Sequence, residues 1–235
     1  MSINLTPFSH PTVMPEVEAL SRPFGAQSLA GTRPGLYRNV VKRVLDILLT
    51  LLAAPVVVPA VIVLALLIST EGVNPFYSQL RIGKNGRAYR MWKLRTMVSD
   101  ADARLEHYLA AHPELRSEWD QKQKLVNDPR ITRFGQFLRN SSIDELPQLW
   151  NVLIGDMALV GPRPMMLSQR SLYPSTGYFA LRPGITGNWQ ISGRNKTTFA
   201  ARAIFDDAYE RELTLAVDAD ILVRTVSVVL RGTGY

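Results

Sequence analysis

The sequence predicts a mostly helical α/β fold, in which a small domain with a short β-hairpin is carried on a re-entrant membrane helix and accompanied by interfacial amphipathic helices. Three observations lead to this fold class. The chain has no charged residue between Ile47 and Ile68. A strand-like stretch with a tight turn follows, and later segments repeat apolar residues at helical spacing. We expect a disordered cytosolic tail over residues 1–34, the membrane helix over 35–72 and one cytosolic domain over 73–235.

The composition limits the kind of protein and partner. A chain of 235 residues can bury one full core. Its formal charge of +7 favours an anionic partner: an acidic lipid surface, a phosphorylated metabolite or a nucleic acid. The absence of cysteine excludes disulfides and thiolate metal sites. Residues from Met1 to about Arg33 are rich in Pro, Ser and Thr, which predicts disorder, and they lack the basic start of a signal peptide.

The apolar run is long enough to span a bilayer, for which ~20 helical residues are needed. Pro55 and Pro59 lie in its middle, where each removes a backbone hydrogen bond and bends the helix. A spanning helix concentrates basic residues on one side, but here they flank both ends: Arg38, Lys42, Arg43, Arg81, Lys84 and Arg87. This favours a re-entrant helix over a spanning or a buried soluble one. We expect Asp46 to stay at the interface, paired with Lys42 or Arg43.

A basic hairpin is predicted between Asn74 and Met97, with Lys84-Asn85-Gly86 as its turn signal. From Ser78 onward this stretch contains several cations and no acid. Two interpretations stay open for it. One is a solvated basic face, and the other is contact with anionic headgroups or a substrate phosphate, which Tyr89 and Trp92 among the cations favour.

Helices are predicted beyond the hairpin. Two charged helices broken at Pro113 are expected between Ser99 and about Leu125. After a turn at Asn127-Asp128-Pro129-Arg130, another helix is expected to turn a core face inward, formed by Ile131, Phe134, Phe137 and Leu138.

The stretch from Arg139 to Pro164 places adjacent carboxylates, Asp144 and Glu145, between Arg139 and Arg163. Ser142-x-x-Glu145 also matches a capping box, so helix capping is one interpretation. Near a helix N-terminus, the dipole and Arg139 are expected to lower a carboxylate's pKa. An ionised aspartate there can attack phosphorus, and two adjacent acids attract Mg²⁺. The following helix is expected to bury an apolar face of Leu146, Leu149, Trp150 and Leu153.

Further candidate residues follow this pair. Gly161-Pro162-Arg163-Pro164 is either a rigid turn that aims the Arg163 guanidinium at phosphate oxygens or a structural turn with an exposed arginine. Trp189, Arg194 and Asn195 lie in a glycine-containing segment that could bind a nucleotide or form a surface loop. An apolar helix face from Ile221 to Leu230 could lie on the bilayer or on the core.

Several long motifs in order resemble the bacterial sugar transferase family, the monotopic polyprenyl-phosphate phosphoglycosyl transferases, and within it the exopolysaccharide undecaprenyl-phosphate galactose phosphotransferases. The resemblance runs from about Lys42 to the C-terminus. The motifs that carry it are Lys93-Leu94-Arg95-Thr96-Met97, the Arg139–Pro164 stretch, Arg182–Asn195 and Phe205–Leu222. The resemblance implies transfer of a sugar 1-phosphate from a UDP-sugar to undecaprenyl phosphate, with release of UMP, at the cytoplasmic face of the bacterial inner membrane.

The resemblance also implies roles for single residues. Asp144 becomes the nucleophile that holds the phosphosugar, and Glu145 the Mg²⁺-binding acid. Asp206 keeps its family position. The resemblance implies that Arg139, Arg163 and Arg194 contact phosphate or nucleotide. It also implies that Lys93 and Arg95 are basic residues near the site. The implied partners are the UDP-sugar, undecaprenyl phosphate, membrane lipids and downstream glycosyltransferases; a homodimer stays open and no nucleic acid is expected.

The chain departs from the family pattern at four places, one of which is Ala208-Tyr209, where the family has Trp-Tyr. The usual Ser-Pro at the membrane bend is Ala54-Pro55, and Lys-Phe-Arg-Thr-Met has Leu94 in place of Phe. Asp218-Ala219-Asp220 carries an acid where the family has a cation, which weakens lipid contact there. Two alternative functions stay open: a non-enzymatic membrane-anchored assembly factor of a polysaccharide synthesis complex, and an enzyme that transfers a plain sugar and releases UDP.

Overall fold

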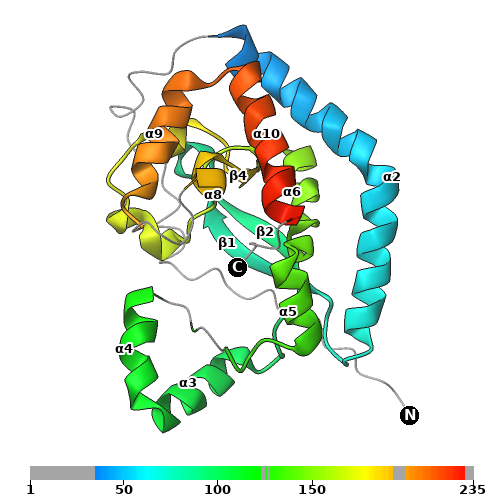
Figure 1. Ribbon diagram of the computed structural model, residues 1–235, viewed down its shortest axis with the longest axis vertical. Coiled ribbons are helices and arrows are strands. Elements are labelled where there is room, and N and C mark those ends of the chain that lie inside the picture. The colour runs from blue at the N-terminus through cyan, green and yellow to red at the C-terminus, as the bar shows by residue number, and fades with distance from the viewer. Residues whose placement is uncertain (1–34, 123–124, 126–127, 193–198, 231–235) are drawn as a thin grey trace, which may run out of the picture.

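The computed structural model describes residues 35–122, 125, 128–192 and 199–230. The predicted disordered tail, Arg194 and Asn195 therefore lie outside the described residues. The described part is mostly helical and contains two short two-stranded sheets, which confirms the predicted fold class (Figure 1).

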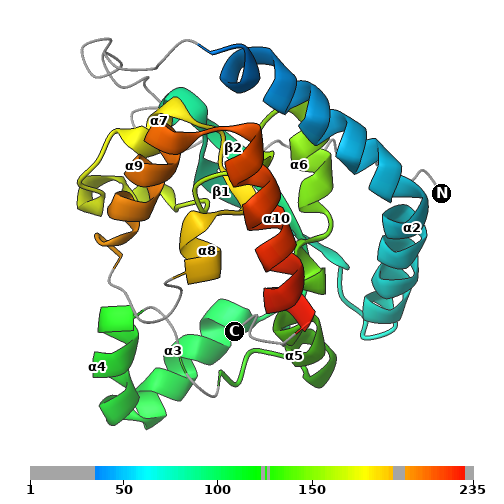
Figure 2. The ribbon, with the colours of Figure 1, turned by 45° about the horizontal axis from the view of Figure 1, so that its top comes forward.

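The longest helix begins with a π-helical turn, Tyr37–Val41, and continues as α2, Lys42–Ser69. Both prolines stay inside α2, and Figures 1 and 2 show the helix bent between its two halves along one flank of the domain. The 33 residues from Tyr37 to Ser69 are long and apolar enough to cross a membrane, and 6% of their most apolar window is buried. The bend agrees with a re-entrant path, and the path through a membrane stays a prediction.

A buried polar cluster docks the start of α2 onto the domain. Lys42 Nζ lies 2.6 Å from Asp218 Oδ2. The same carboxylate accepts hydrogen bonds from the hydroxyls of Tyr37 and Tyr209, at 2.6 and 2.5 Å. Asp46 pairs with Lys42 at 4.0 Å, as expected, but it is buried in the domain rather than exposed at an interface. The reason is that its carboxylate accepts a backbone N–H of β3 (Ala158–Val160).

The predicted hairpin is confirmed. Strands β1, Phe76–Ile82, and β2, Ala88–Leu94, pair antiparallel around a turn in which Asn85 has φ 59°. Asparagine tolerates this left-handed conformation better than most residues. In the register, Arg81 pairs with Tyr89 and Tyr77 with Lys93. Since side chains alternate along a strand, Arg81 and Lys93 share one face of the hairpin.

The two helices predicted around Pro113 are α3, Ala101–Ala111, and α4, Pro113–Lys122, with the proline at the first helical position, where it is tolerated. They lie at the end of the molecule opposite the start of α2 (Figures 1 and 2). Helix α5, Arg133–Asn140, buries Leu138 as predicted. The prediction was wrong for Phe137, which is 57% exposed because only part of this short helix packs on the core.

Helix α6, Gln148–Ile154, lies between α2 and the hairpin. The predicted inward face is wrong: the fully buried side chains are Gln148, Asn151 and Val152, whereas Trp150 is 58% exposed. The reason is Asn151. Its side chain accepts a hydrogen bond from the N–H of Trp92 and donates one to the carbonyl of Arg90, so the polar face of α6 turns toward β2.

The remaining elements complete the domain. Strand β3 pairs parallel with β4, Gly184–Thr186. The helices around them are α7, Gly177–Ala180; α8, Asn188–Ser192; α9, Arg202–Glu212; and α10, Leu215–Leu230. Helix α10 packs on the core through one face, and contact of its other face with a bilayer stays a prediction. Ile221 packs in the core, while Val223 and Val226 are exposed on the opposite face.

Candidate active site

The carboxylate pair lies in a 3₁₀ turn, Ile143–Glu145, before α6. Ser142 precedes it with φ 57° and makes no capping hydrogen bond, so the capping box does not form. Lys93 reaches both acids instead. Its Nζ lies 2.6 Å from Glu145 Oε1 and 3.5 Å from Asp144 Oδ2. The Lys93 ammonium therefore bridges the two carboxylates. The pair forms a site that binds positive charge.

Asp144 is 7% exposed, and its pKa is raised rather than lowered as the sequence predicted. Burial is the largest cause, since it disfavours the charged carboxylate. Lys93 and Arg139 oppose this effect, and the negative charge of Glu145 adds to it. The prediction considered the nearby cation and the helix dipole but not the depth of the carboxyl group.

A second cluster forms where the Gly-Pro-Arg-Pro turn meets α8 and α9. The Arg202 guanidinium donates to the carbonyl of Arg163 at 2.8 Å and lies 4.9 Å from the ring centre of Trp189. The Arg163 guanidinium lies 5.9 Å from the same ring. After burial, the positive charge of Arg163 is the next largest cause of the lowered pKa of Arg81, so the two guanidiniums lie close together. We call Arg81, Arg163 and Arg202 the arginine cluster.

The arginine cluster lacks a negative counterpart in direct contact. Among the described residues, no carboxylate oxygen lies within 4.0 Å of its nitrogens. The Nε atoms of Arg81 and Arg202 are buried and, in the described part of the chain, have no hydrogen-bond partner. Burial lowers the pKa of both guanidiniums. Since unpaired buried charge is costly, the cluster is suited to an anion.

Asp206 is a buried carboxylate close to Arg202 of this cluster. It is 3% exposed and accepts a short hydrogen bond of 2.5 Å from the Tyr173 hydroxyl. Burial raises the pKa of Asp206 to about 6, although Tyr173 and Arg202 act in the opposite direction. Asp206 is therefore held by Tyr173 and lies near enough to Arg202 for their charges to interact.

The hairpin connects the carboxylate pair to the arginine cluster. Lys93 pairs with Tyr77, and Arg81 lies four positions further along β1 on the same face. At ~3.4 Å per residue the separation along the strand is about 14 Å. A sugar linked to a diphosphate and a nucleoside is extended enough to contact both groups.

An apolar groove of about 290 Å³ opens beside the carboxylates. Leu146 and Pro147, the two residues after Glu145, belong to its wall. The rest of its lining comes from α2, the hairpin and α6: Thr50, Ala54, Val57, Val58, Val61, Ile62, Phe76, Trp92, Leu149, Trp150 and Leu153. The groove thus contains the apolar face of α6 that was expected to be buried in the core.

The predicted site residues separate into three sets. Lys93, Arg139, Asp144 and Glu145 come together, with Arg139 held by a 2.8 Å hydrogen bond to Thr96. Arg163 and Asp206 belong to the second cluster. Arg95 instead donates to the carbonyl of Asn74, after α2, and among the described residues no hydrogen bond or ion pair joins it to the carboxylates. Arg194 lies outside the described residues.

Sequence reasoning missed Arg202 and Asn151 and placed Arg81 only in a general basic run. Arg202 follows an unremarkable Ala-rich segment, so its role depends on where α9 begins. Asn151 carried a signal that went unused, since an amide side chain in a mostly apolar helix is a candidate for a buried hydrogen-bonding group.

A family model described as bacterial sugar transferase matches residues 37–232. The chain belongs to the bacterial sugar transferase family. Because this match covers both clusters and the groove, the site belongs to the family's shared region.

Relatives with assigned names agree with this family. The chain is 38% identical to the exopolysaccharide production protein ExoY of Rhizobium meliloti, over 96% of both chains. It is 42% identical to a UDP-galactose-lipid carrier transferase of Erwinia amylovora and 41% identical to an undecaprenyl-phosphate galactose phosphotransferase of Salmonella typhimurium, in each case over 83% of this chain. It spans only 41% of the length of these two relatives.

Proposed function

We propose that the chain transfers a sugar 1-phosphate, galactose 1-phosphate in the first instance, from a UDP-sugar to undecaprenyl phosphate and releases UMP. The observation that carries this proposal is the position of the Lys93-bridged carboxylate pair between an arginine cluster and an apolar groove. The names of the relatives support the sugar and the lipid. The reaction would begin the synthesis of an exopolysaccharide or another glycoconjugate, ahead of downstream glycosyltransferases.

In the first half-reaction, a carboxylate oxygen of Asp144 attacks the phosphorus that bears the sugar. The bond from that phosphorus to the oxygen bridging to UMP breaks, and UMP leaves with the electron pair. The product is an acyl phosphate between Asp144 and the sugar phosphate. The arginine cluster offsets the negative charge of the nucleotide phosphates.

In the second half-reaction, a phosphate oxygen of undecaprenyl phosphate attacks the same phosphorus. The bond to Asp144 breaks, the carboxylate is restored, and the lipid gains a diphosphate-linked sugar. The groove supports this step, since a prenyl chain lying against Leu146 and Leu149 carries its phosphate to the carboxylate end of α6.

The acids also suit Mg²⁺, which takes oxygen ligands from one or two carboxylates together with substrate phosphates. Glu145 is the proposed ligand, and Lys93 already holds positive charge at the same carboxylate. Among the described residues, no group of three or more metal-binding side chains occurs, so substrate oxygens would complete the coordination. A bound Mg²⁺ would neutralise charge on the transferred phosphate.

The exposed apolar residues support attachment to the cytoplasmic face of the inner membrane. Besides α2, exposed apolar side chains occur on α6 and α10, including Trp150, Ile154, Val223 and Val226. Amphipathic helices with such faces lie in membrane interfaces. We propose that α2 enters the bilayer as a re-entrant helix and that α6 and α10 rest on its surface.

Nucleotide release tests the function. Detergent-purified protein is incubated with undecaprenyl phosphate and a panel of UDP-sugars, with and without EDTA, and the released nucleotide is identified. We expect UMP, fastest with UDP-galactose, and loss of release with EDTA. Release of UDP would indicate plain sugar transfer, and no release with any UDP-sugar would favour the assembly-factor alternative.

Lys93→Met is expected to move the acidic limb of the pH–rate profile to higher pH. Lys93 lowers the pKa of Asp144, so its removal raises that pKa further, and the protonated, inactive acid persists to higher pH. We expect a roughly tenfold or greater rate loss at pH 6 and a smaller one at pH 9. Lys93→Arg retains the positive charge and should leave the limb near its original position. An equal loss by Lys93→Met at every pH would contradict this role.

Leu149→Gln is expected to raise the KM for undecaprenyl phosphate by about fivefold to thirtyfold, because a polar group in the groove costs ~1–2 kcal/mol of apolar contact. Formation of the phosphosugar adduct from UDP-sugar alone should be unchanged. Val223→Gln, at an exposed apolar residue outside the groove lining, is the control. Similar KM values for Leu149→Gln and Val223→Gln would contradict a role of the groove in binding undecaprenyl phosphate.

A further inference from the structure

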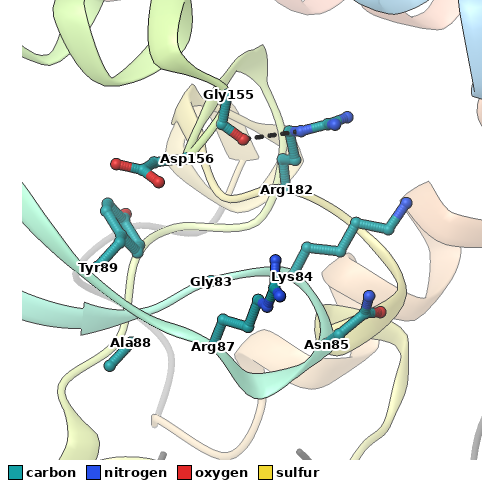
Figure 3. A pocket seen from close by; sticks show the side chains of 9 residues that line it. All are labelled: Gly83, Lys84, Asn85, Arg87, Ala88, Tyr89, Gly155, Asp156 and Arg182. Atoms are coloured by element: carbon teal, nitrogen blue, oxygen red, sulfur yellow. Dashed lines mark hydrogen bonds between the residues drawn. The ribbon is translucent and has the colours of Figure 1, made fainter.

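A second cavity lies at the opposite end of α6 from the carboxylate pair, about 10 Å away along the helix. It has a volume of about 620 Å³ and is open to solvent on one side. Its walls come from the hairpin turn, the turn after α6 and the segment before β4: Gly83, Lys84, Asn85, Arg87, Ala88, Tyr89, Gly155, Asp156 and Arg182 (Figure 3). None of these residues belongs to the carboxylate pair or the arginine cluster.

Three cations line this cavity without a carboxylate partner. Within the described chain, no carboxylate oxygen lies within 4.0 Å of Lys84, Arg87 or Arg182. Figure 3 shows Asp156, the one acidic residue of the lining, on the Tyr89 side of the cavity and away from the Lys84 ammonium. The positive charge is therefore concentrated on one side.

One of the cations is held in place. The Arg182 Nε donates to the carbonyl of Gly155 at 2.9 Å, which fixes the guanidinium at the cavity wall (Figure 3). By contrast, within the described part of the chain the Lys84 and Arg87 side chains make no hydrogen bond, and both residues are exposed. The cavity combines one preset guanidinium with two cations that can move onto a ligand.

The Arg43 guanidinium adds positive charge next to the cavity wall. A Cβ at Gly155 would lie 3.5 Å from Arg43 Nη2, which places that guanidinium against the cavity wall. Although Lys84 is exposed at the tip of the hairpin, partial desolvation by the surrounding cavity walls lowers its pKa, and the positive charges of Arg182 and Arg38 lower it further. A bound anion would relieve this repulsion.

The cavity also lies beside the membrane-facing surface. Ile154, next to Gly155 in the cavity wall, is 52% exposed. Arg43 belongs to the first turns of α2 and also donates to the α6 carbonyls of Val152 and Leu153. If α2 enters a bilayer, the cavity stands at the depth of the lipid headgroups.

We propose that this cavity is a second phosphate-binding site, separate from the active site, and that its occupant is the phosphate of an anionic phospholipid headgroup. The lipid would lie with its phosphate between Lys84, Arg87 and Arg182 and its acyl chains toward Ile154. A bound lipid there would anchor the hairpin and the end of α6 to the membrane. The same chemistry would admit a soluble phosphate, which the experiment below distinguishes.

The test uses full-length, detergent-purified protein and the short-chain lipid dihexanoyl-phosphatidylglycerol, titrated below its micellar concentration and followed by calorimetry. We expect binding to weaken roughly tenfold or more in Lys84→Gln/Arg87→Gln. The matched control is Arg90→Gln/Arg133→Gln, which removes two exposed cations outside the cavity and should bind like the wild type. Dihexanoyl-phosphatidylcholine, which has the same chains and no net charge, should bind weakly to all three proteins.

A parallel titration with inorganic phosphate identifies the source of the ligand. If Lys84→Gln/Arg87→Gln weakens phosphate binding but not lipid binding, the site takes soluble phosphate and the lipid assignment is overturned. Equal lipid and phosphate binding by all three proteins, or an equal loss in the control, overturns the site itself. The active-site arginines are intact in every variant, so UMP release measured alongside reports on the proposed reaction separately.

Discussion

Asp144→Asn is expected to abolish UMP release, with a loss of roughly 10³-fold or more, because the amide cannot form the acyl phosphate. The substitution keeps the shape of the side chain and removes a carboxylate that is expensive to bury. Membrane association and thermal stability should therefore be retained. The measurement is UMP release from UDP-sugar, together with mass spectrometry of protein quenched in acid after exposure to the UDP-sugar alone.

Wild-type protein should carry one hexose phosphate on the peptide that contains Asp144, and Asp144→Asn should carry none. Asp220→Asn is the control, since Asp220 is an exposed carboxylate on α10 paired with Arg224. An adduct on another side chain, or substantial turnover by Asp144→Asn, would show that Asp144 is not the nucleophile. Loss of turnover with an unfolded protein would instead point to a structural role.

Asp218→Ala is expected to destabilise the attachment of α2 by about 3–5 kcal/mol. The carboxylate bonds Lys42, Tyr37 and Tyr209, in a cluster where the start of the long helix meets α9 and α10. Its removal leaves a buried ammonium without its closest partner. We expect a lower unfolding temperature in detergent and faster proteolysis in the first turns of α2.

The matched control is Asp220→Ala, two residues away on the same helix. Its ion pair with Arg224 is exposed, and exposed pairs contribute only ~0–1 kcal/mol. Equal unfolding temperatures for Asp218→Ala and Asp220→Ala would show that the buried cluster does not hold α2.

Much of the local structure was predictable, because the responsible signals lie within a few residues. The Lys-Asn-Gly turn forms where Asn85 adopts a positive φ, and Pro113 begins a new helix. The charge-free run forms one long helix with both prolines inside it. The carboxylate pair and Lys93 meet as the family resemblance implied, although 51 positions separate Lys93 from Asp144.

The predictions that failed were those that depend on which neighbouring element a helix face packs against. The apolar face of α6 lines an open groove because Asn151 pairs with β2, and periodicity does not reveal which face meets a partner. The pKa of Asp144 was predicted in the wrong direction for a related reason. Nearby cations are visible in the motif, but the desolvation that dominates depends on what covers the carboxyl group.

The amino-acid sequence alone determined the long apolar helix, the hairpin, the position of the acidic pair and the family resemblance, since each is set by short-range pattern or motif. The tertiary structure decided which cations gather. Arg81, Arg163 and Arg202 come from β1, the turn after β3 and α9, and they meet only when these elements pack together. Charge in a sequence can be counted, but whether a charge is buried, paired or left for a ligand depends on the residues that surround it in space.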